Sequence, residues 1–534
     1  MLNLFRAFVS GLSLGPLHNF SHVPAAYFAP ADAWRRPSDY VAHLARKFEE
    51  GKPDPKTGKA VARPLKRDQV YFIAQFAAAC NTVWKEERGD TPMNKRSLFN
   101  MLLIGEGDTG KTAIVQEIVL PAADFIFLMQ EPTSKPSLIV CAKWSQAENI
   151  STKTHKAVSC HRAGLIGVQS YRNAHMHPRA KKRALTRAWD EKRVLVIEEV
   201  GTVAPPLYNM LLYRSWHGRA EKYDVPEPEY DKLSGAFGRV PIKVHLGDFL
   251  QLKPTASNLS LVSNVRAMEA AGLLKEVPAE YQQAMRLFCQ IPMCFELKAT
   301  NRFKDTKIRD LVAFMRKPAK MLPPEISRHW ESIQMRPSDP RLSEERFQTG
   351  HMLAIYWATV SRWMGMRARR DAKALDVPLF LLQAADTASP AMPRDLTAKL
   401  LNRPNPKDTG CMHGALYVHA GMHFRLLAAL DIDKGLVKDA EGEIVHVVIN
   451  PADQALVDAA MAAGKPFLYL KHVPLGIWAR MKKFDQACFG DALNDPDDGL
   501  PTSLKESLVF IEPHTSSSFK YRGRWSFHVG FCLQ

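Results

Sequence analysis

The sequence predicts an α/β fold with parallel sheets that carry helices on both faces. Three observations lead to this prediction. Short, continuously apolar segments such as RVLVIEEV (193–200) alternate along the chain with helical patterns. A glycine-rich loop at 105–112 directly follows one apolar segment. Acidic and amide side chains gather where other apolar segments end, which is the edge where parallel sheets carry their chemistry.

Length and charge set wide limits on the function. The chain has 534 residues, enough for two or three domains, and its hydrophobic content of 46% and charged content of 24% are ordinary for a soluble globular protein. The formal net charge of +17 favours an anionic partner, and nucleic acid is the usual one. A generally basic protein without such a partner is the alternative.

Cysteines and apolar runs exclude several classes of protein. Eight cysteines are scattered without a C-x-x-C pair, so neither a zinc ribbon nor a disulfide framework is predicted, and a reducing compartment fits best. No apolar run is long enough to span a bilayer, so no membrane partner is expected. The N-terminal segment MLNLFRAFVSGLSLGPLHNF has one Arg and no acid, which leaves the mitochondrion as an alternative to the expected nuclear location.

The first half of the chain carries most of the predicted elements. Residues 1–60 end in GKPDPKTGK and are predicted to form a leader and linker. From Leu65 a helical pattern places apolar side chains at Val70, Ile73 and Phe76. The elements predicted after it are a strand at 97–105, a helix at 112–127, and strands at 137–142, 193–200 and 240–248. Residues 61–295 are therefore predicted to form a first domain.

A second α/β region is predicted from about residue 350. Its apolar segments include HMLAIYWATVSRWMG, VPLFLLQA, HFRLLAAL and EIVHVVIN. A proline- and arginine-rich crossing at 316–341 separates it from the first region. Residues 296–534 are predicted to form a second domain with a small inserted subdomain.

Residues 105–112, GEGDTGKT, have the pattern of a loop that surrounds phosphate groups. They satisfy G-x-x-x-x-G-K-[ST] between a predicted strand and a predicted helix. Backbone N–H groups surround the phosphates, Lys111 reaches the β and γ phosphates, and the Thr112 hydroxyl binds Mg²⁺. The predicted ATP-binding residues of the loop are Gly105, Gly107, Asp108, Thr109, Gly110, Lys111 and Thr112. A glycine-rich turn without a ligand is the alternative.

Two acids in this loop lie where a polyanion is expected. Glu106 can point into solvent, because the backbone does the binding. Asp108 occupies a position that often takes glycine, and Asp tolerates a left-handed backbone better than most residues. Its charge would weaken phosphate binding if the side chain faced the nucleotide.

Two further segments end in polar residues suited to ATP hydrolysis. RVLVIEEV places Glu198 and Glu199 at a strand end, where one acid holds Mg²⁺ and the next activates the attacking water. KVHLGDFLQLKP (243–254) places Gln251 beyond another strand, where an amide can sense the γ-phosphate. An exposed acidic strand end and an ordinary Gly-Asp turn are the alternatives.

Together these segments resemble the PIF-type, RecD-like helicases of superfamily one, which move 5′ to 3′ on single-stranded DNA. GDFLQLKP matches every fixed position of the family's G-D-x-x-Q-L-x-P motif, and LKRDQ is similar to its Q motif. LIVCAKWSQAENISTKTHKAV is similar to its DNA-touching motif, and FELKATNRFKD is similar to its fourth motif. The similarity extends from about residue 65 to the C-terminus and includes GMHFRLLAALDIDKGLVKDAEGEIV.

The resemblance implies two RecA-like P-loop NTPase domains with ATP at their interface. It implies Gln69 as the adenine reader, Thr154 and His155 as DNA contacts, and Arg302 as a finger that reaches the γ-phosphate. The implied catalytic residues are Lys111, Glu199, Gln251 and Arg302, and the implied metal ligands are Thr112 and Glu198. ATP and Mg²⁺ are the implied cofactors. Single-stranded DNA and DNA junctions are the implied partners of a monomer that serves DNA repair, recombination or telomere maintenance.

The chain departs from the family pattern at three places. Glu198 stands where the Mg²⁺ motif normally has Asp, and Lys438 and Asp439 replace the usual Asn-Gly. The chain stops at HVGFCLQ and holds no H-x-S-Q-G motif, so the second domain is expected to be incomplete, as in a truncated product, an incomplete gene model or a helitron-type relic. We therefore expect an ATP-dependent DNA helicase or translocase. A catalytically weak DNA-binding remnant and an RNA-stimulated ATPase are the alternatives.

Three tryptophans and a basic run are further candidates for nucleic-acid contact. Trp144, Trp189 and Trp216 could stack on bases, but core packing is favoured for each. HPRAKKRALTR (177–187) could contact DNA or direct nuclear import, but a solvated helix face is favoured. The histidines show no ligand spacing, so no metal other than nucleotide-bound Mg²⁺ is predicted.

Overall fold

The structure, a computed structural model, divides into two compact units, Met1–Gln334 and Met335–Gln534. It describes residues 36–533 apart from 54–59, 128–134, 153, 167–181, 229–232, 252–253, 255–258, 264, 299–304, 317–322, 334–338, 341–343, 345–355, 388–392, 403–411, 432–435, 465, 483–499, 506–507, 522–523 and 532. None of the helices in these ranges is both long enough and apolar enough to cross a membrane.

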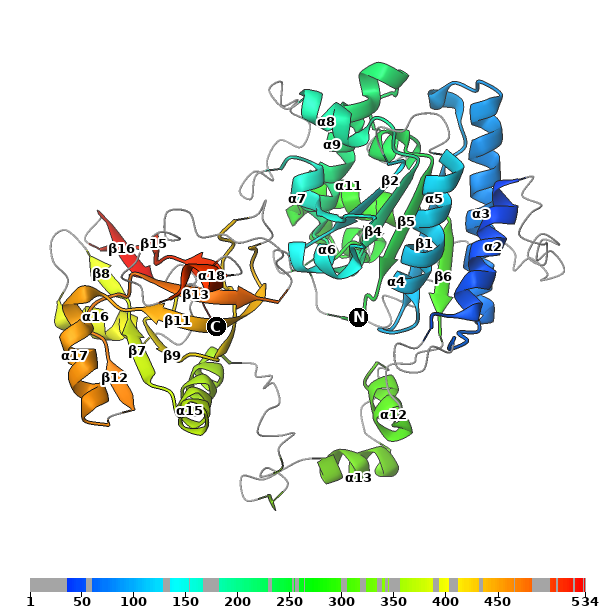
Figure 1. Ribbon diagram of the computed structural model, residues 1–534. Coiled ribbons are helices and arrows are strands. Elements are labelled where there is room, and N and C mark those ends of the chain that lie inside the picture. Colours follow the sequence, from blue (N-terminus) through cyan, green and yellow to red (C-terminus); the bar gives the residue numbers. More distant parts are fainter. Residues whose placement is uncertain are drawn as a thin grey trace. The chain divides into compact units, whose positions relative to one another are not determined.

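A parallel sheet of six described strands forms the centre of the first unit (Figure 1). Its strands lie in the order β3 (Val158–Ser159), β2 (Ser137–Cys141), β4 (Val194–Glu198), β5 (Ile242–Gly247), β1 (Phe99–Gly105) and β6 (Met293–Leu297). Every pairing between neighbours is parallel. The four strands predicted between 97 and 248 are all present, and the predicted α/β fold class is confirmed.

The strands of this sheet are apolar throughout because both faces are covered. All five residues of β4 are buried, and successive side chains point to opposite faces. Val194 and Val196 pack into one hydrophobic core, whereas Leu195 and Ile197 pack into the other. The run of apolar residues in the sequence therefore reflects two cores rather than one.

Helices from separate parts of the chain cover the two faces. One face carries α2 (Pro37–Glu50), α3 (Arg67–Arg88), α5 (Leu120–Phe127) and α6 (Trp144–Ile150), with α4 (Lys111–Ile114) and the π-helical turn η4 (Val115–Val119) leading into α5. The other face carries α7 (Cys160–Ala163), α8 (Lys182–Trp189), α9 (Pro205–Tyr223), η7 (Leu233–Arg239) and α11 (Ala279–Phe288). The π-helical turn ends two residues before Pro121, which lacks the N–H that a regular helix needs.

Shorter elements complete the first unit. They are η3 (Met93–Lys95), η6 (Val200–Thr202), α10 (Val265–Ala270), η8 (Leu273–Glu276), α12 (Thr306–Met315) and α13 (Pro324–Ile333). The part of the chain predicted as leader and linker contains α2, whose apolar side chains pack into the same core as α3.

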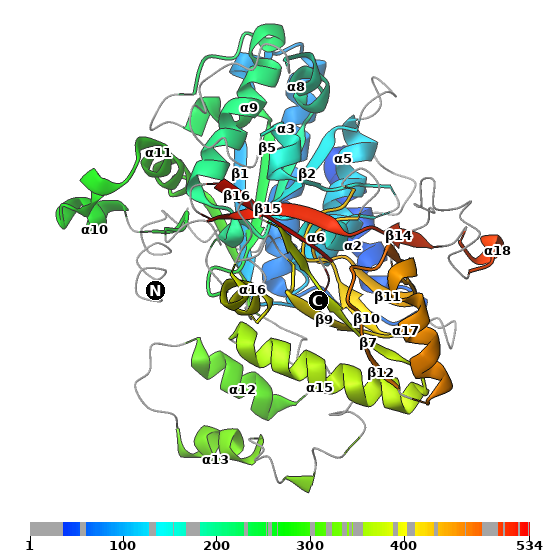
Figure 2. The same cartoon turned by 90° about the vertical axis from the view of Figure 1, so that its left-hand side faces the viewer.

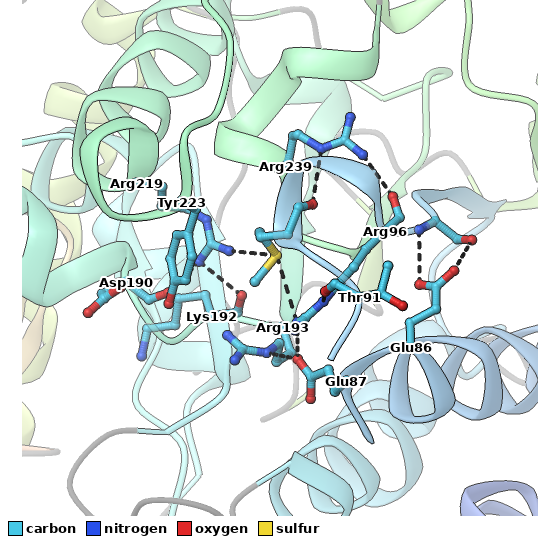
Figure 3. Close-up of polar contacts among 12 residues, drawn as sticks. Glu86, Glu87, Thr91, Arg96, Asp190, Lys192, Arg193, Arg219, Tyr223 and Arg239 are labelled. Atoms are coloured by element: carbon cyan, nitrogen blue, oxygen red, sulfur yellow. Dashed lines mark hydrogen bonds and ion pairs between the residues drawn. The ribbon is translucent and has the colours of Figure 1, made fainter. Parts of the chain in front are cut away.

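Buried charges form a network at the edge where β1, β4 and β5 begin, which we call the amino edge (Figure 3). Arg219 of α9 is fully buried. Its guanidinium donates hydrogen bonds to the carbonyl oxygens of Gly238 and Trp189, each at 2.7 Å, and of Asp190 at 2.5 Å. Burial lowers the pKa of Arg219 to about 10. Helix α9 is thereby tied to the segments that precede β4 and β5.

Three further arginines belong to the network at the amino edge, and two of them contact α3. Glu87, near the end of α3, contacts the guanidinium of Arg96 at 2.6 Å and also that of Arg193. Arg239 donates to the carbonyl oxygens of Met93 at 3.3 Å and Arg96 at 2.7 Å (Figure 3). Arg96, Arg193 and Arg239 stand within three residues of the start of β1, β4 and β5 respectively, so the network fixes where these strands begin.

The described part of the second unit contains three small sheets. The first has the strand order β12 (Phe467–Tyr469), β7 (Leu379–Gln383) and β9 (Ala415–Val418). The second has the order β10 (His423–Arg425), β11 (Glu441–Val448), β13 (Gly476–Met481) and β14 (Val509–Ile511). The third has the order β15 (His514–Tyr521), β16 (Arg524–Gly530) and β8 (Ala385–Thr387). The helices are α15 (Trp357–Leu375), α16 (Arg394–Leu401), α17 (Pro451–Ala462) and α18 (Thr502–Lys505). Helix α15 packs along β7 and β9 (Figure 2).

The strand directions of this unit differ from those expected. Among the described strands only β12 and β7 pair in parallel, and the other pairings are antiparallel. The expected parallel sheet is therefore corrected here to mainly antiparallel pairing. The described residues between β10 and β11 form no helical crossover, and antiparallel pairing does not require one. Buried and half-exposed residues alternate along much of β11, as in a strand with one covered face.

Candidate active site

The predicted nucleotide-binding residues converge at the opposite edge of the first sheet, which we call the carboxyl edge. The neighbouring strands β4, β5 and β1 end there at Glu198, Gly247 and Gly105. The phosphate loop follows β1, the acidic pair closes β4, and Asp248 follows β5. Because parallel strands end at the same edge, three separate segments meet at one site.

The phosphate loop adopts a compact, partly left-handed conformation. Asp108 has φ of 60° with an exposed side chain, and Gly110 has φ of 91° at the N-terminus of α4. The Lys111 ammonium is buried and donates to the carbonyl oxygens of Gly105 and Glu106, each at 2.7 Å. Burial lowers the pKa of Lys111, and the nearby carboxylates of the site oppose that shift. The lysine ammonium is thus hydrogen-bonded to carbonyl oxygens of the loop itself.

Gln69 of α3 contacts the phosphate loop directly. Its amide nitrogen donates to the carbonyl oxygen of Thr109 at 2.8 Å, and its amide oxygen accepts from the Lys66 N–H at 2.8 Å. A Cβ at Gly110 would lie 2.8 Å from that nitrogen, so the loop packs closely on Gln69. The structure therefore places Gln69 as a support of the loop, and its reading of adenine stays a prediction.

Thr112 and Glu198 meet across the sheet edge. The Thr112 hydroxyl donates to Glu198 Oε1 at 2.8 Å. Burial raises the pKa of Glu198 to about 7; the hydrogen bond from Thr112 opposes this rise, and the charge of Glu199 adds to it. The two predicted metal ligands are therefore in contact with each other.

Glu199 has an unusual backbone for its residue type. Its φ of 51° lies in the left-handed region, which costs about 1–3 kcal/mol for a residue without special tolerance. Burial raises its pKa, while the charge of Lys111 opposes the rise. A raised pKa suits a carboxylate that takes up a proton during catalysis.

The site presents acceptors that suit Mg²⁺. Glu198 Oε2 and Glu199 Oε2 are buried and have no hydrogen-bond partner among the described residues. Hydroxyl and carboxylate oxygens are ligands that Mg²⁺ accepts, and Mg²⁺ takes few of them from protein when phosphates supply the others. Within the described ranges no group of three or more His, Cys, Asp or Glu is placed to bind a metal by itself. The residues present therefore fit nucleotide-bound Mg²⁺.

Arg316 joins the site although no sequence motif predicted it. Its guanidinium contacts Asp248 Oδ1 at 2.6 Å and Glu106 Oε1 at 3.0 Å. The residue follows the last turn of α12, far from both acids in sequence. A single sequence gives no signal for such a contact.

For two other predicted catalytic residues, Gln251 and Arg302, the structure describes no side-chain contact with the site. Gln251 lies three residues beyond Asp248, and its side chain is exposed. Arg302 lies outside the described residues. Their catalytic roles stay predictions.

The predicted DNA contacts lie after α6. Thr154 is exposed, whereas His155 is buried and its Nε2 lies 2.8 Å from Asp124 Oδ2 of α5. Burial alone would raise the pKa of Asp124, but the hydrogen bond and charge of His155 hold it below its ordinary value. His155 therefore anchors this segment to α5, and Thr154 is the member of the pair that solvent reaches.

The tryptophans behave mainly as packing residues. Trp189 is fully buried, and its indole N–H donates to the Ala163 carbonyl oxygen at 2.9 Å. Trp216 is half-buried and donates to Val225. Trp144 is half-buried, with the Arg162 guanidinium 5.7 Å from its ring centre. Within the predicted basic run, residues 177–181 lie outside the described residues and 182–187 belong to α8.

Comparison with known proteins gives distant structural neighbours. No family model matches the chain, and no curated protein matches it. A structure from DNA unwinding at forked dsDNA by two coordinating Pif1 helicases is 13% identical, with 88% of this chain and 81% of that chain covered and a TM-score of 0.45. Pif1 helicase from Candida albicans is 17% identical (88% and 84% covered, TM-score 0.42), and Bacteroides Pif1 bound to ssDNA is 14% identical (84% and 80% covered, TM-score 0.45).

Proposed function

We propose that this protein is an ATP hydrolase that couples hydrolysis to 5′ to 3′ movement on single-stranded DNA. The observation that carries the ATPase part is the contact of Thr112 with Glu198 beside a buried Lys111. This contact joins the phosphate loop to the acidic strand end, two motifs that the sequence places far apart. The DNA part rests on the motif resemblance of GDFLQLKP and on the net charge of +17.

ATP and Mg²⁺ would be held by the loop and by β4. Backbone N–H groups of 107–112 and the start of the helix α4–η4–α5 would surround the phosphates. Thr112 and Glu198 would hold Mg²⁺, which neutralises charge on the phosphates when bound. Lys111 would leave the carbonyl oxygens of Gly105 and Glu106 and turn its ammonium to the phosphates.

Glu199 would position and deprotonate the attacking water. Its raised pKa and its Oε2, which has no hydrogen-bond partner among the described residues, support this role, because a carboxylate of higher pKa is a stronger base. Gln251 and Arg302 would report the loss of the γ-phosphate, as the motif resemblance implies. Exposed Thr154 would contact the DNA backbone, and His155 would hold that segment on α5.

The ATP site is tested by nucleotide binding to the full chain and to Lys111→Ala. We expect the variant to bind ATP about 10- to 100-fold more weakly, because charge-assisted hydrogen bonds to phosphate are lost. Circular dichroism and thermal unfolding would verify that the variant is folded. Equal binding by both proteins would refute the assignment of the loop.

The polymer is tested by the steady-state ATPase rate with single-stranded DNA, with RNA and with neither. We expect DNA to stimulate the rate most, and a DNA duplex with a 5′ tail to be unwound in preference to one with a 3′ tail. Stronger stimulation by RNA would support the RNA-dependent alternative. DNA binding without stimulation would support the weakly active alternative.

A further inference from the structure

Arg316 bridges two acids at the mouth of the phosphate loop. Its two terminal nitrogens donate to Asp248, Nη2 to Oδ1 at 2.6 Å and Nη1 to Oδ2 at 3.0 Å. Its Nε lies 3.0 Å from Glu106 Oε1. Such a two-pronged contact fixes the plane of the guanidinium as well as its position. The arginine is therefore oriented by three separate contacts.

The cluster formed by Arg316, Asp248 and Glu106 is partly shielded from solvent. The Asp248 side chain is 4% exposed, whereas those of Arg316 and Glu106 are 23% and 29% exposed. Electrostatic interactions at such a site are stronger than on an open surface but are still screened in part by solvent. The charges of Arg316, Asp248 and Glu106 should therefore change the affinity of the loop for an anion.

The charges at the carboxyl edge make a triphosphate difficult to accept without Arg316. The acids that follow or end β1, β4 and β5 there are Glu106, Asp108, Glu198, Glu199 and Asp248, of which Asp108 is exposed. Lys111 and Arg316 are the cations that contact the loop or its neighbouring acids. Mg²⁺ held by Thr112 and Glu198 would offset the charge at the end of β4 but would leave the charge of Glu106 to be balanced by other groups. Glu106 belongs to the loop itself, so its unpaired charge would repel the phosphates directly.

We propose that Arg316 is a positioning residue for ATP, which pairs with Glu106 and Asp248 so that the acidic phosphate loop accepts a triphosphate. The inference rests on the proposed function, because it concerns ATP binding at the same loop. It explains how a phosphate loop can carry a glutamate beside its first glycine. It also links the nucleotide to α12, because Arg316 directly follows the end of that helix.

A purely structural role is the competing explanation. In that case Arg316 would serve to tie α12 to the sheet, and its removal would loosen α12 whatever the charge of Glu106. A charge-neutralising role differs, because removal of the Glu106 charge should then compensate for the loss of Arg316. The two explanations therefore separate in a double-mutant cycle.

The test measures the dissociation constants of ATP and ADP for the full chain, Arg316→Ala, Glu106→Gln and the double variant. We expect Arg316→Ala to bind ATP about tenfold more weakly, with a smaller loss for ADP and a smaller loss at high salt. The double variant should bind ATP within about threefold of Glu106→Gln. ATP binding by Arg316→Ala equal to wild type, or no recovery in the double variant, would overturn the proposal.

Two further variants keep the test decisive. Arg316→Lys retains the charge but loses the two-pronged contact, so it should bind ATP nearly as wild type does and remains usable if Arg316→Ala does not fold. Arg309→Ala removes an exposed arginine from α12, the helix that Arg316 follows, and should leave ATP binding unchanged. If wild type and Lys111→Ala both fail to bind ATP, the proposed function fails and this proposal fails with it. If wild type binds ATP and every Arg316 variant binds equally, only this proposal fails.

Discussion

The amino edge and the carboxyl edge of the first sheet both bury charged side chains, but they satisfy these charges differently. At the amino edge, the Arg219 guanidinium donates to several backbone carbonyl oxygens, and Glu87 contacts two arginines. At the carboxyl edge, Glu198 and Glu199 each keep a buried oxygen without a hydrogen-bond partner among the described residues. The division is not complete, because at the amino edge Arg193 Nη1 and Asp190 Oδ1 also have no hydrogen-bond partner within the described part of the chain.

This difference suggests that the charges of the amino edge stabilise the fold, whereas those of the carboxyl edge are available to bind a ligand. Buried polar atoms are normally paired, so a buried carboxylate oxygen that is left without a partner is an acceptor available to a ligand. The pKa directions agree with this view, since burial raises the pKa of both Glu198 and Glu199. We therefore expect substitutions at the amino edge to change stability and those at the carboxyl edge to change nucleotide binding.

Arg219→Met should have the largest effect on stability. The substitution removes all the hydrogen bonds that the buried guanidinium donates and leaves the carbonyl oxygens of four residues without that partner. We expect the free energy of unfolding to fall by about 3–5 kcal/mol, as when one member of a buried ionic network is removed. Urea denaturation measures this change, and ATP binding under native conditions should stay close to that of wild type.

Lys222→Met is the matched control, because Lys222 lies on the same helix, is largely exposed and contacts Asp190 at 2.6 Å. Its loss should cost less than about 1 kcal/mol. Equal stability of the two variants would show that the network at the amino edge does not hold the sheet together.

Lys243 should make stability depend on pH. It is fully buried in β5, where its ammonium donates to the Val240 carbonyl oxygen at 2.8 Å. Burial lowers its pKa to about 7, and the positive charges of Arg239 and Arg219 lower it further. Between pH 7 and 9 the unfolded chain still holds the lysine proton while the folded chain has released it. The free energy of unfolding should therefore rise with pH, by about 2–3 kcal/mol over that range.

The comparison of wild type with Lys243→Met isolates this contribution. Methionine has no proton to release, so the variant should be the more stable protein near pH 6, and its advantage should shrink towards pH 9. Urea denaturation at several pH values measures the difference. A difference that does not vary with pH would mean that Lys243 keeps its ordinary pKa in the folded protein.

Much of the first unit could be predicted from the sequence because its signals are local. Strands buried on both faces are continuously apolar, so β1, β2, β4 and β5 stand out from their surroundings. The phosphate loop is a short pattern with fixed spacing, and the pairing of Thr112 with Glu198 follows once both strands are placed in one parallel sheet.

The remaining features depend on contacts between distant residues. Nothing in the helical pattern of α9 indicates that Arg219 is buried, and nothing near α12 indicates that Arg316 reaches Glu106. The strand directions of the second unit were missed for a related reason, since an apolar segment such as EIVHVVIN predicts a strand but not its partner. Contacts of this kind emerge only from the assembled fold.

Asp108→Asn should have the smallest effect and separates the two acids of the phosphate loop. Asp108 is exposed with φ of 60°, and Asn tolerates that backbone equally well, so stability should change by less than about 0.5 kcal/mol. ATP affinity should change by less than about threefold, because solvent screens the charge of an exposed carboxylate. Titration with ATP at low and high salt measures this. An increase in ATP affinity of tenfold or more would mean that the Asp108 side chain faces the phosphates. The repulsion of the phosphates that we assign to Glu106 would then come from Asp108.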